Sequence, residues 1–339
     1  MFLPLHTTRV TLRSFAPADT AVFAAYRNDP EVARYQDWDL PVTEAGALEF
    51  LTAQQTVARP VPGDWVQIAV EYDGELAGDV AVGLDPAGKQ ATIGYTLRAD
   101  RQRLGIGREA VSALVDVLLD QLDVHRVTAT LDPRNTGSAR LLEQLGFRYE
   151  GCAKAAAAVR GGWEDDDRYA LLREDREAWL ARPLGHPDEV ALVEIDPSNV
   201  GAVARLATHR TQERFVAPMA GSFQDALVPE LVDGVPAVPW MRAVAADDEL
   251  AGFVMLAEVT PTMPEPYLWR LLIDRRHQRR GIGARVVELV VRHLREQGHQ
   301  VLKTSWVDAP DGPEPFYRCL GFGPTGELDD DEIVATLRL

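Results

Sequence analysis

The sequence predicts two α/β domains in tandem, and two observations support this fold class. A strand, a glycine loop and a helix follow one another twice, with the loops Gln-Arg-Leu-Gly-Ile-Gly at 102–107 and Gln-Arg-Arg-Gly-Ile-Gly at 278–283. The loops are 176 residues apart, and the glycines that end a later helix, Gly146 and Gly321, are 175 apart. A chain of 339 residues has room for two domains of ordinary size. We interpret the chain as a tandem duplication.

The elements of the first half follow from hydrophobic periodicity and turn residues. Alternating apolar residues predict the strands, an Asp73-Gly74 turn joins two of them, and Thr43 is placed to cap a helix. Strands are expected at 5–15, 66–70, 76–82, 92–98, 126–131, from 147 onward and at 163–172, and helices from 19 to 27, at 43–58, through 111–122 and at 139–145.

The second half repeats this order after a break. Two prolines and a glycine at 183–188 predict a linker, so the domains are expected at 1–182 and 189–339. The same patterns place strands at 190–195, 240–245, 250–259, 267–274 and 301–306, and helices from 196–199, at 222–232, through 286–294 and at 313–320.

The repeated loop has the composition of an anion site. Glycines let backbone N–H groups close on a phosphate, and the start of a helix favours negative charge. The loops lack both the Gly-Lys-Ser/Thr of nucleotide-binding P-loops and the third glycine of dinucleotide loops. A tight turn with two chance glycines is the alternative for one copy, and the second copy disfavours it.

Gln-x-x-Gly-x-Gly between a strand and a helix resembles the coenzyme A loop of the GNAT superfamily of N-acetyltransferases. The resemblance covers both halves. It implies for each half a mixed, mostly antiparallel sheet flanked by helices, in which the fourth and fifth strands separate and admit the pantetheine arm.

Each half resembles a different branch of that superfamily. The first is similar to ribosomal-protein N-terminal acetyltransferases through Thr8–Arg13, Asn28–Val32 and Asn135–Leu142. The second is similar to bacterial diamine and spermine/spermidine acetyltransferases through Gln212–Pro218, Leu268–Asp274 and Phe316–Phe322, although Met219 and Gly221 depart from that pattern.

The resemblance names acetyl-CoA as the cofactor and implies which residues hold it. They lie at the end of the strand before each loop and in the loop itself, where arginines add positive charge. The arginines could equally be solvated. The predicted cofactor-binding residues are Leu97, Gln102, Arg103, Gly105, Gly107 and Arg108 in the first half, and Leu272, Ile273, Gln278, Arg279, Arg280, Gly281, Gly283 and Ala284 in the second.

Acetyl transfer to an amine also needs a proton donor for the departing thiolate. The resemblance gives this role to Tyr317, a phenol with an ordinary pKa near 10, with core packing as the alternative. The first half has Leu142 at that position. There, Asn135 and Ser138 match the family variant in which a serine hydroxyl or a water donates. No side chain can be named as the base.

A polyamine acceptor calls for carboxylates along a groove. The candidates in the second half are Glu213, Glu258 and the pair Asp308/Asp311, each of which could instead be solvated. One of the acids at 164–167 could line the acceptor pocket of the first half, although a solvent-facing turn explains them as well.

Composition limits the partners. A net charge of −17 disfavours nucleic acid and is compatible with a cationic acceptor. The chain has no apolar stretch long enough to span a membrane, no signal-peptide pattern at its start, two cysteines and no metal-ligand spacing, so we expect a cytoplasmic protein without a metal.

These observations predict an acetyl-CoA-dependent N-acetyltransferase that acts on a small primary amine or a peptide N-terminus, with a polyamine or diamine as the acceptor of the second half. The alternative is that one half, more readily the first, binds coenzyme A or supports the fold without catalysis. A monomeric pseudo-dimer and a homodimer both remain open.

Overall fold

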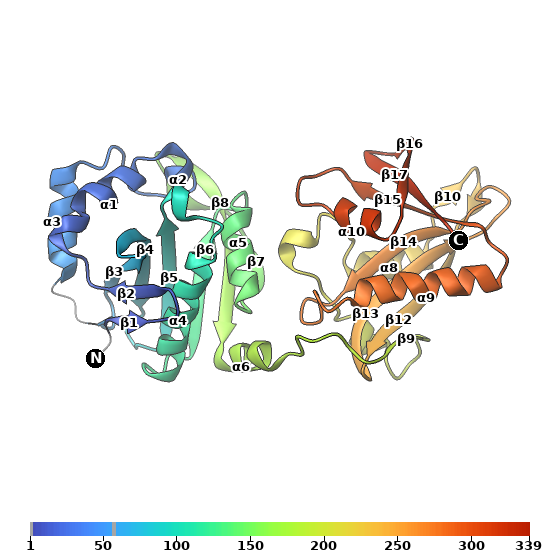
Figure 1. Ribbon diagram of the computed structural model, residues 1–339, viewed down its shortest axis with the longest axis horizontal. Coiled ribbons are helices and arrows are strands. Elements are labelled where there is room, and N and C mark those ends of the chain that lie inside the picture. Colours follow the sequence, from blue (N-terminus) through green and yellow to red (C-terminus); the bar gives the residue numbers. More distant parts are fainter. Residues whose placement is uncertain (1–2, 56–58) are drawn as a thin grey trace. The chain divides into compact units, whose positions relative to one another are not determined.

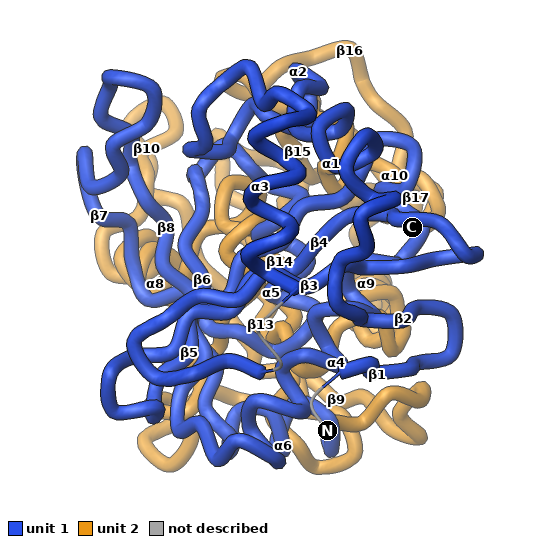
Figure 2. The backbone as a smooth tube through the Cα atoms, turned by 90° about the vertical axis from the view of Figure 1, so that its left-hand side faces the viewer, with its two compact units in different colours: residues 1–181 blue, residues 182–339 orange. Residues whose placement is uncertain are grey.

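A computed structural model describes residues 3–55 and 59–339, which form two compact units at 1–181 and 182–339 (Figure 2). Each unit is a sheet with helices on both faces (Figure 1).

The first unit contains an eight-stranded sheet in the order β1-β2-β3-β4-β5-β6-β8-β7. Its strands are β1 (Leu5–His6), β2 (Val10–Arg13), β3 (Trp65–Tyr72), β4 (Glu75–Leu84), β5 (Gln90–Leu97), β6 (Arg126–Leu131), β7 (Arg148–Val159) and β8 (Gly162–Leu172). Its helices are α1 (Thr20–Arg27), α2 (Pro30–Ala33), α3 (Glu44–Gln55), α4 (Ile106–Asp120), α5 (Thr136–Gln144) and α6 (Arg173–Ala181).

The second unit contains a seven-stranded sheet in the order β9-β12-β13-β14-β15-β17-β16. Its strands are β9 (Val190–Val193), β12 (Val238–Ala246), β13 (Glu249–Glu258), β14 (Tyr267–Ile273), β15 (Val301–Val307), β16 (Gly323–Asp329) and β17 (Glu332–Arg338), with β10 (Leu231–Val232) and β11 (Val235–Pro236) in a separate hairpin. Its helices are α7 (Val200–Val203), α8 (Met219–Leu227), α9 (Ile282–Glu296) and α10 (Glu314–Cys319).

The two sheets share one topology. Strands β2-β3-β4-β5-β6-β8-β7 of the first unit correspond in order to β9-β12-β13-β14-β15-β17-β16 of the second. One neighbouring pair in each sheet is parallel, β5–β6 and β14–β15, while the other paired strands that the structure describes are antiparallel. The predicted mixed, mostly antiparallel fold is confirmed in both halves.

Helices cover both faces of each sheet because each sheet has two apolar faces. In the first unit, apolar residues of α4 pack into one core cluster, and residues of α1 and α3 pack into another. In the second unit, α9 and α10 belong to one cluster, and α7 and α8 to the other.

Some predicted elements differ in extent. The strand expected at 5–15 is a hairpin of two strands. The helix expected at 222–232 runs from Met219 to Leu227, because Leu231–Val232 pairs with Val235–Pro236 in the β10–β11 hairpin, whose turn at Asp233-Gly234 has φ of 49° and 81°. Thr43 caps α3 by accepting a bond from the Gly46 N–H at 3.1 Å, while the predicted end of that helix at 56–58 lies outside the described residues.

Candidate functional site

A gap opens between the parallel strands of each unit. Strands β5 and β6 pair only from Gln90–Thr92 with Arg126–Thr128, although they continue to Leu97 and Leu131. Strands β14 and β15 pair only from Tyr267–Leu268 with Lys303–Thr304, although both continue for several residues. The separation implied by the resemblance is therefore present in both halves.

The glycine loop follows the free end of the first strand of each gap. The Gln102 side chain donates to the Leu97 carbonyl at 3.2 Å, and the Gln278 side chain donates to the Ile273 carbonyl at 3.0 Å. Each predicted glutamine therefore ties its loop to the preceding strand. Leu272, which is also on the predicted list, is buried in the core instead.

Both loops have the same backbone shape. Arg103 and Gly105 have φ of 60° and 80°, and Arg279 and Gly281 have φ of 62° and 75°. The glycines are the N-caps of α4 and α9 and provide no side-chain cap. The first N–H groups of each helix therefore have no intrahelical acceptor and can bind an anion such as the diphosphate of coenzyme A.

The second glycine of each loop allows close side-chain packing. A Cβ at Gly107 would lie 3.0 Å from Leu141 and 3.2 Å from Leu97, and a Cβ at Gly283 would lie 3.3 Å from the Phe316 ring. These glycines have no positive φ. They are needed to bring the helix start against the strand and the following helix.

The predicted arginines divide into two groups. Arg103, Arg108 and Arg279 are exposed, and Ala284 is half-buried. Arg280 is only 4% exposed, and its guanidinium donates to the Gly185 carbonyl at 2.8 Å and contacts His277 Nδ1 at 3.0 Å. This corrects its assignment as a phosphate ligand, because its nitrogens are directed at protein acceptors.

Tyr317 lies under the gap of the second unit. It is 9% exposed, stacks on Trp306 with ring centroids 5.5 Å apart, and hydrogen-bonds with Thr304, the last residue of β15 that pairs with β14. Burial raises the pKa of Tyr317 to about 12, which the hydrogen bond with Thr304 opposes. The phenol is protonated at neutral pH, but it is a weaker acid than a free tyrosine.

The first unit places a different tyrosine at its gap. Tyr95 projects from β5, and its hydroxyl lies 2.7 Å from Ser138 Oγ on α5. Burial raises the pKa of Tyr95. Asn135 is the N-cap of α5 and accepts a bond from the Ser138 N–H at 3.1 Å, so it shapes the helix start that carries Ser138.

Two of the predicted acceptor acids already have arginine partners. Glu213 binds Arg210 at 2.6 Å, and Asp311 binds Arg214. Asp308 is exposed.

Glu258 lies far from the glycine loop of the second unit. It lines a pocket with His293 near the C-terminal end of α9, whereas the loop adjoins Ile282 at the N-terminal end. At 1.5 Å per residue these two ends are about 16 Å apart. The assignment of Glu258 to the acceptor site stays a prediction.

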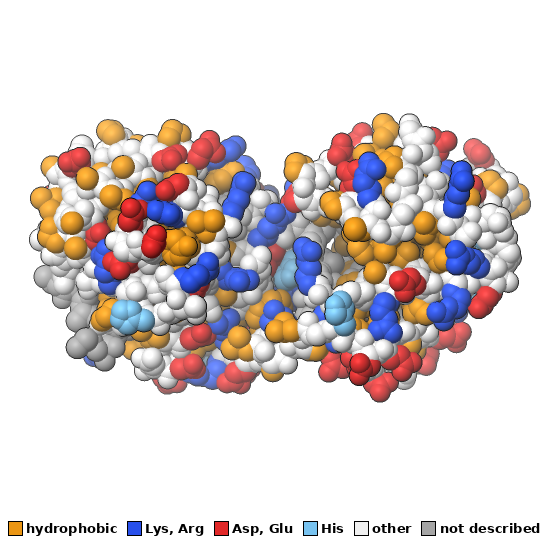
Figure 3. Space-filling model, in the orientation of Figure 1, with side chains coloured by type: hydrophobic (Ala, Val, Ile, Leu, Met, Phe, Trp, Pro, Cys, Tyr) orange, Lys and Arg blue, Asp and Glu red, His pale blue; other side chains and the backbone are white. Residues whose placement is uncertain are grey.

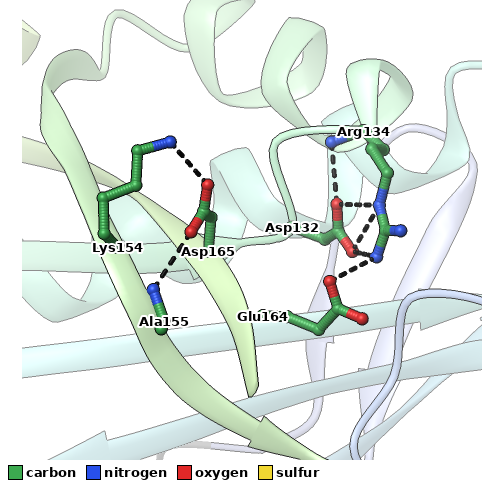
Figure 4. Close-up of polar contacts among 6 residues, drawn as sticks. All are labelled: Asp132, Arg134, Lys154, Ala155, Glu164 and Asp165. Atoms are coloured by element: carbon green, nitrogen blue, oxygen red, sulfur yellow. Dashed lines mark hydrogen bonds and ion pairs between the residues drawn. The ribbon is translucent and has the colours of Figure 1, made fainter. Parts of the chain in front are cut away.

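The acids at 164–167 have different surroundings. Figure 4 shows Glu164 bound by Arg134, at 2.9 Å, and Asp165 bound by Lys154, at 2.6 Å. Asp167 is buried and accepts a hydrogen bond from Tyr149 at 3.3 Å. Asp166 is half-buried, and burial raises its pKa, which Arg168 and a hydrogen bond from Thr130 oppose.

One feature common to both units was not predicted. Thr130 of β6 bonds with Asp166 of β8, and Ser305 of β15 donates to Glu332 of β17. The strands occupy the same places in the two sheets, and β6–β8 and β15–β17 are antiparallel neighbours. The acidic residues at 164–167 are a sequence signal for the Thr130–Asp166 pair, but no local pattern indicates the Ser305–Glu332 pair.

Both hydroxyl–carboxylate pairs lie where the gap is open. Thr130 is beyond Thr128, the last residue of β6 that pairs with β5, and Ser305 is beyond Thr304, the last residue of β15 that pairs with β14. The neighbours Leu131 and Trp306 belong to the core clusters that contain α4 and α9. Because side chains alternate along a strand, Thr130 and Ser305 face the opposite side of each sheet.

The part of the chain that the structure describes contains no cluster of three or more histidine, cysteine, aspartate or glutamate residues that could hold a metal. None of its helices meets the length and hydropathy needed to cross a membrane. On the face drawn in Figure 3, acidic and basic side chains are interspersed over both units, unlike the continuous basic surface that nucleic acid favours.

Family models match both halves. The model described as Acetyltransferase (GNAT) domain matches residues 9–148, and the model described as Acetyltransferase (GNAT) family matches residues 204–322. Both halves of the chain belong to the GNAT acetyltransferases. The protein is an acetyl-CoA-dependent N-acetyltransferase, and its loops fit the coenzyme because they present free helix N-termini to a diphosphate.

The chain is also similar to individual proteins over about one half of its length or less. The chain is 29% identical over 173 residues to the uncharacterized N-acetyltransferase p20 of Bacillus licheniformis. The aligned region covers 50% of this chain and 97% of p20. It is 34% identical over 83 residues to the ribosomal protein uS5-alanine N-acetyltransferase of Escherichia coli. That alignment covers 24% of this chain and 43% of that enzyme. A structure of Mycobacterium smegmatis RimJ in complex with CoA-disulfide is 26% identical, with a TM-score of 0.45, over 51% of this chain and 88% of RimJ.

Proposed function

We propose that each half of this GNAT acetyltransferase has its own catalytic site and acetylates a primary amine. The observation that carries the proposal is the recurrence of three parts in both halves: the strand gap, the glycine loop, and the hydroxyl–carboxylate pair beside the gap. A half that had become a structural partner would have no reason to keep all three.

Asp166 and Glu332 act as the proton acceptors in this proposal. Acetyl-CoA supplies a thioester carbonyl, and an amine must lose a proton to attack it. Each carboxylate lies on the sheet face opposite the glycine-loop helix, and a neighbouring hydroxyl holds it in place. The raised pKa of Asp166 brings its basicity nearer to that of the amine.

The proton donors differ between the halves. In the second, the Tyr317 hydroxyl donates to the departing sulfur. In the first, Ser138 donates, and Tyr95 orients its hydroxyl at 2.7 Å. Asn135 acts indirectly, because it caps the helix that carries Ser138.

The acceptors also differ in this proposal. The first half takes a peptide N-terminus, which fits its resemblance to ribosomal-protein acetyltransferases. The second takes a diamine or polyamine. Its cation-binding carboxylates are Glu332 and Asp329, which accepts a bond from the Tyr267 hydroxyl at 3.1 Å, because Glu213 and Asp311 are already bound by arginines.

The test combines single variants with separate acceptors. Asp166→Asn is expected to lower acetylation of N-terminal peptides, and Glu332→Gln to lower acetylation of spermidine, each by roughly 100-fold or more. Glu164→Gln is the matched control, because Glu164 is held by Arg134. CoA release is followed with a thiol reagent.

If one of the two variants changes no reaction, that half is not catalytic. If spermidine and short diamines release no CoA while another small amine does, the polyamine assignment fails and the two-site proposal stands.

A further inference from the structure

A glycine lies in the interior of β5 although the fold does not require one there. Gly94 has no positive φ, and among the described residues a Cβ built on it would contact only the Ala81 Cβ, at an ordinary 3.7 Å. Glycine weakens the interior of a strand, and it often marks a place where a ligand or another backbone approaches closely. The small size of Gly94 is therefore free to serve a ligand.

Gly94 lies beside the gap, on the sheet face opposite α4. Its neighbour Ile93 belongs to the core cluster that contains α4, so Gly94 faces the side where Asp166 lies. It is two residues beyond Thr92, the last residue of β5 that pairs with β6. Gly94 and its cross-strand partner Ala81 are half-buried although β4 and β5 are interior strands, so the helices leave this part of the face open.

The second half has an arginine at the matching position. Gly78 and Gly252 end the repeated sequence Glu-Leu-Ala-Gly and occupy matching places in β4 and β13. The residue that pairs with Gly94 is the third after Gly78, and Met255, which pairs with Arg270, is the third after Gly252. Gly94 and Arg270 both lie past the paired part of their parallel strands.

An ion pair fills this position in the second half. Arg270 donates to the carboxylate of Asp225 on α8 at 3.0 Å and to the Trp269 carbonyl at 2.8 Å. Met255, the cross-strand neighbour of Arg270, is fully buried, whereas Ala81 is half-buried. A bound arginine side chain therefore stands where the first half has bare backbone.

The distance across the first sheet suits a short peptide. Asp166 lies on β8, two strands away from β5, so at least about 10 Å separate it from Gly94 at normal strand spacing. Three residues of extended chain span about this distance. A peptide whose amine is at Asp166 therefore passes over Gly94 near its third residue.

We propose that this position decides on which side of the gap the acceptor extends, an inference that rests on the proposed function of both halves. Gly94 lets a peptide lie flat against β5 while its N-terminal amine reaches Asp166. Arg270, held by Asp225, closes the same path in the second half. The acceptor there keeps only the side over β15 and β17, which suits a short alkyl amine and excludes a peptide chain.

The first test uses the full chain with Glu332→Gln, so that only the first half acetylates. Trialanine amide is compared with glycinamide, which is one residue long and does not reach Gly94. Gly94→Ala should raise the KM for trialanine amide about 10-fold, the effect of one methyl group in a fitted site, and Gly94→Val should raise it further. The KM for glycinamide and the calorimetric affinity for CoA should not change.

The second test uses the full chain with Asp166→Asn, so that only the second half acetylates. Arg270→Gly combined with Asp225→Asn opens the path without leaving an unpaired carboxylate. It should increase acetylation of trialanine amide about 10-fold or more and leave spermidine acetylation unchanged. Arg270→Lys, which keeps the length and the charge, is the matched control and should gain no peptide activity.

The Gly94→Ala result decides the proposal, because its Cβ has room in the fold. An unchanged KM for trialanine amide would overturn the proposal, and so would an equal rise for glycinamide, which would indicate general damage to the site. In both cases the loss of peptide acetylation in Asp166→Asn would leave the proposed function standing. If Asp166→Asn keeps full peptide acetylation, the proposed function itself fails, and this inference fails with it.

Discussion

The two halves are alike around the glycine loop and differ in the side chains beside the strand gap. Both keep the loop with two positive-φ residues and the gap between parallel strands. The tyrosine at the gap comes from the strand in the first half, as Tyr95, and from the helix in the second, as Tyr317. Leu142, which occupies the position of Tyr317 in the first half, is fully buried. The tyrosine beside the gap therefore differs between the halves, whereas the loop keeps one backbone shape.

The strand beside the gap also differs. Strands β4 and β5 pair without interruption from Gly78–Leu97 to Leu84–Ala91, whereas β13 and β14 shift register between Met255 and Leu256. The shift leaves Trp269 as an extra residue, and such a bulge re-aims neighbouring side chains. The side chains of β14 are therefore directed differently from those of β5, although the two strands occupy the same position in their sheets.

A buried polar network in the first half has an apolar counterpart in the second. Asp79 of β4 is 1% exposed and accepts bonds from Tyr26, Gln67 and Arg27. Gly78 of the first half corresponds to Gly252 of the second, so the residue that matches Asp79 is Phe253. The Phe253 ring packs on the Phe223 ring, with centroids 6.3 Å apart. This part of the interior is therefore polar in the first half, at Asp79, and apolar in the second, at Phe253.

The largest expected difference concerns the second glycine of each loop. Gly107→Val should weaken coenzyme binding in the first half by about 100-fold, the upper range of overpacking, because the new atoms meet Leu141 and Leu97. Gly283→Val should weaken the second site by about 10-fold, because only the Phe316 ring has to move. Calorimetry on each variant measures both sites, and equal losses would contradict this comparison.

The next prediction concerns the tyrosine of the second half. Tyr317→Phe should lower spermidine turnover by roughly 10- to 100-fold, with little change in coenzyme affinity. Its raised pKa makes proton transfer harder by about 3 kcal/mol than for a free phenol, so we expect less than the full effect of a general acid. Unchanged turnover would leave Tyr317 as a core residue.

The pH response of folding provides a check on the same residue. A phenol whose pKa is about 12 in the folded state and near 10 in the unfolded state stabilises the fold fully below pH 10. That stability is lost as pH rises from 10 through 12. Urea unfolding between pH 9 and 12 should therefore show a smaller loss in Tyr317→Phe than in the parent chain.

The smallest expected effect concerns Tyr95. Tyr95→Phe removes the partner of Ser138 Oγ, and we expect peptide acetylation to fall about 5- to 10-fold through turnover rather than KM. Spermidine acetylation by the same protein should be unchanged. If Tyr95→Phe is as active as the parent chain while Ser138→Ala is not, Ser138 acts without this partner.

The sequence predicted what local patterns determine. Two glycine loops, their flanking strands and helices, and the cap at Thr43 depend on residues close together in the chain. The shared strand order follows once the duplication is seen.

Features that depend on distant packing were missed. Arg280 is buried because the segment at 185–188 folds onto the loop. The local sequence around Arg280 does not distinguish it from an exposed arginine. Ser305 and Glu332 are 27 residues apart and meet only because β17 pairs with β15.

The number of coenzyme molecules bound per chain tests the account most directly. Calorimetric titration of the full-length protein with CoA should give a stoichiometry of two, because both loops have the same backbone shape and both gaps are open. Gly107→Val should reduce it to one and leave the second binding event unchanged. A stoichiometry of one in the parent chain would contradict the claim that both halves keep a working cofactor site.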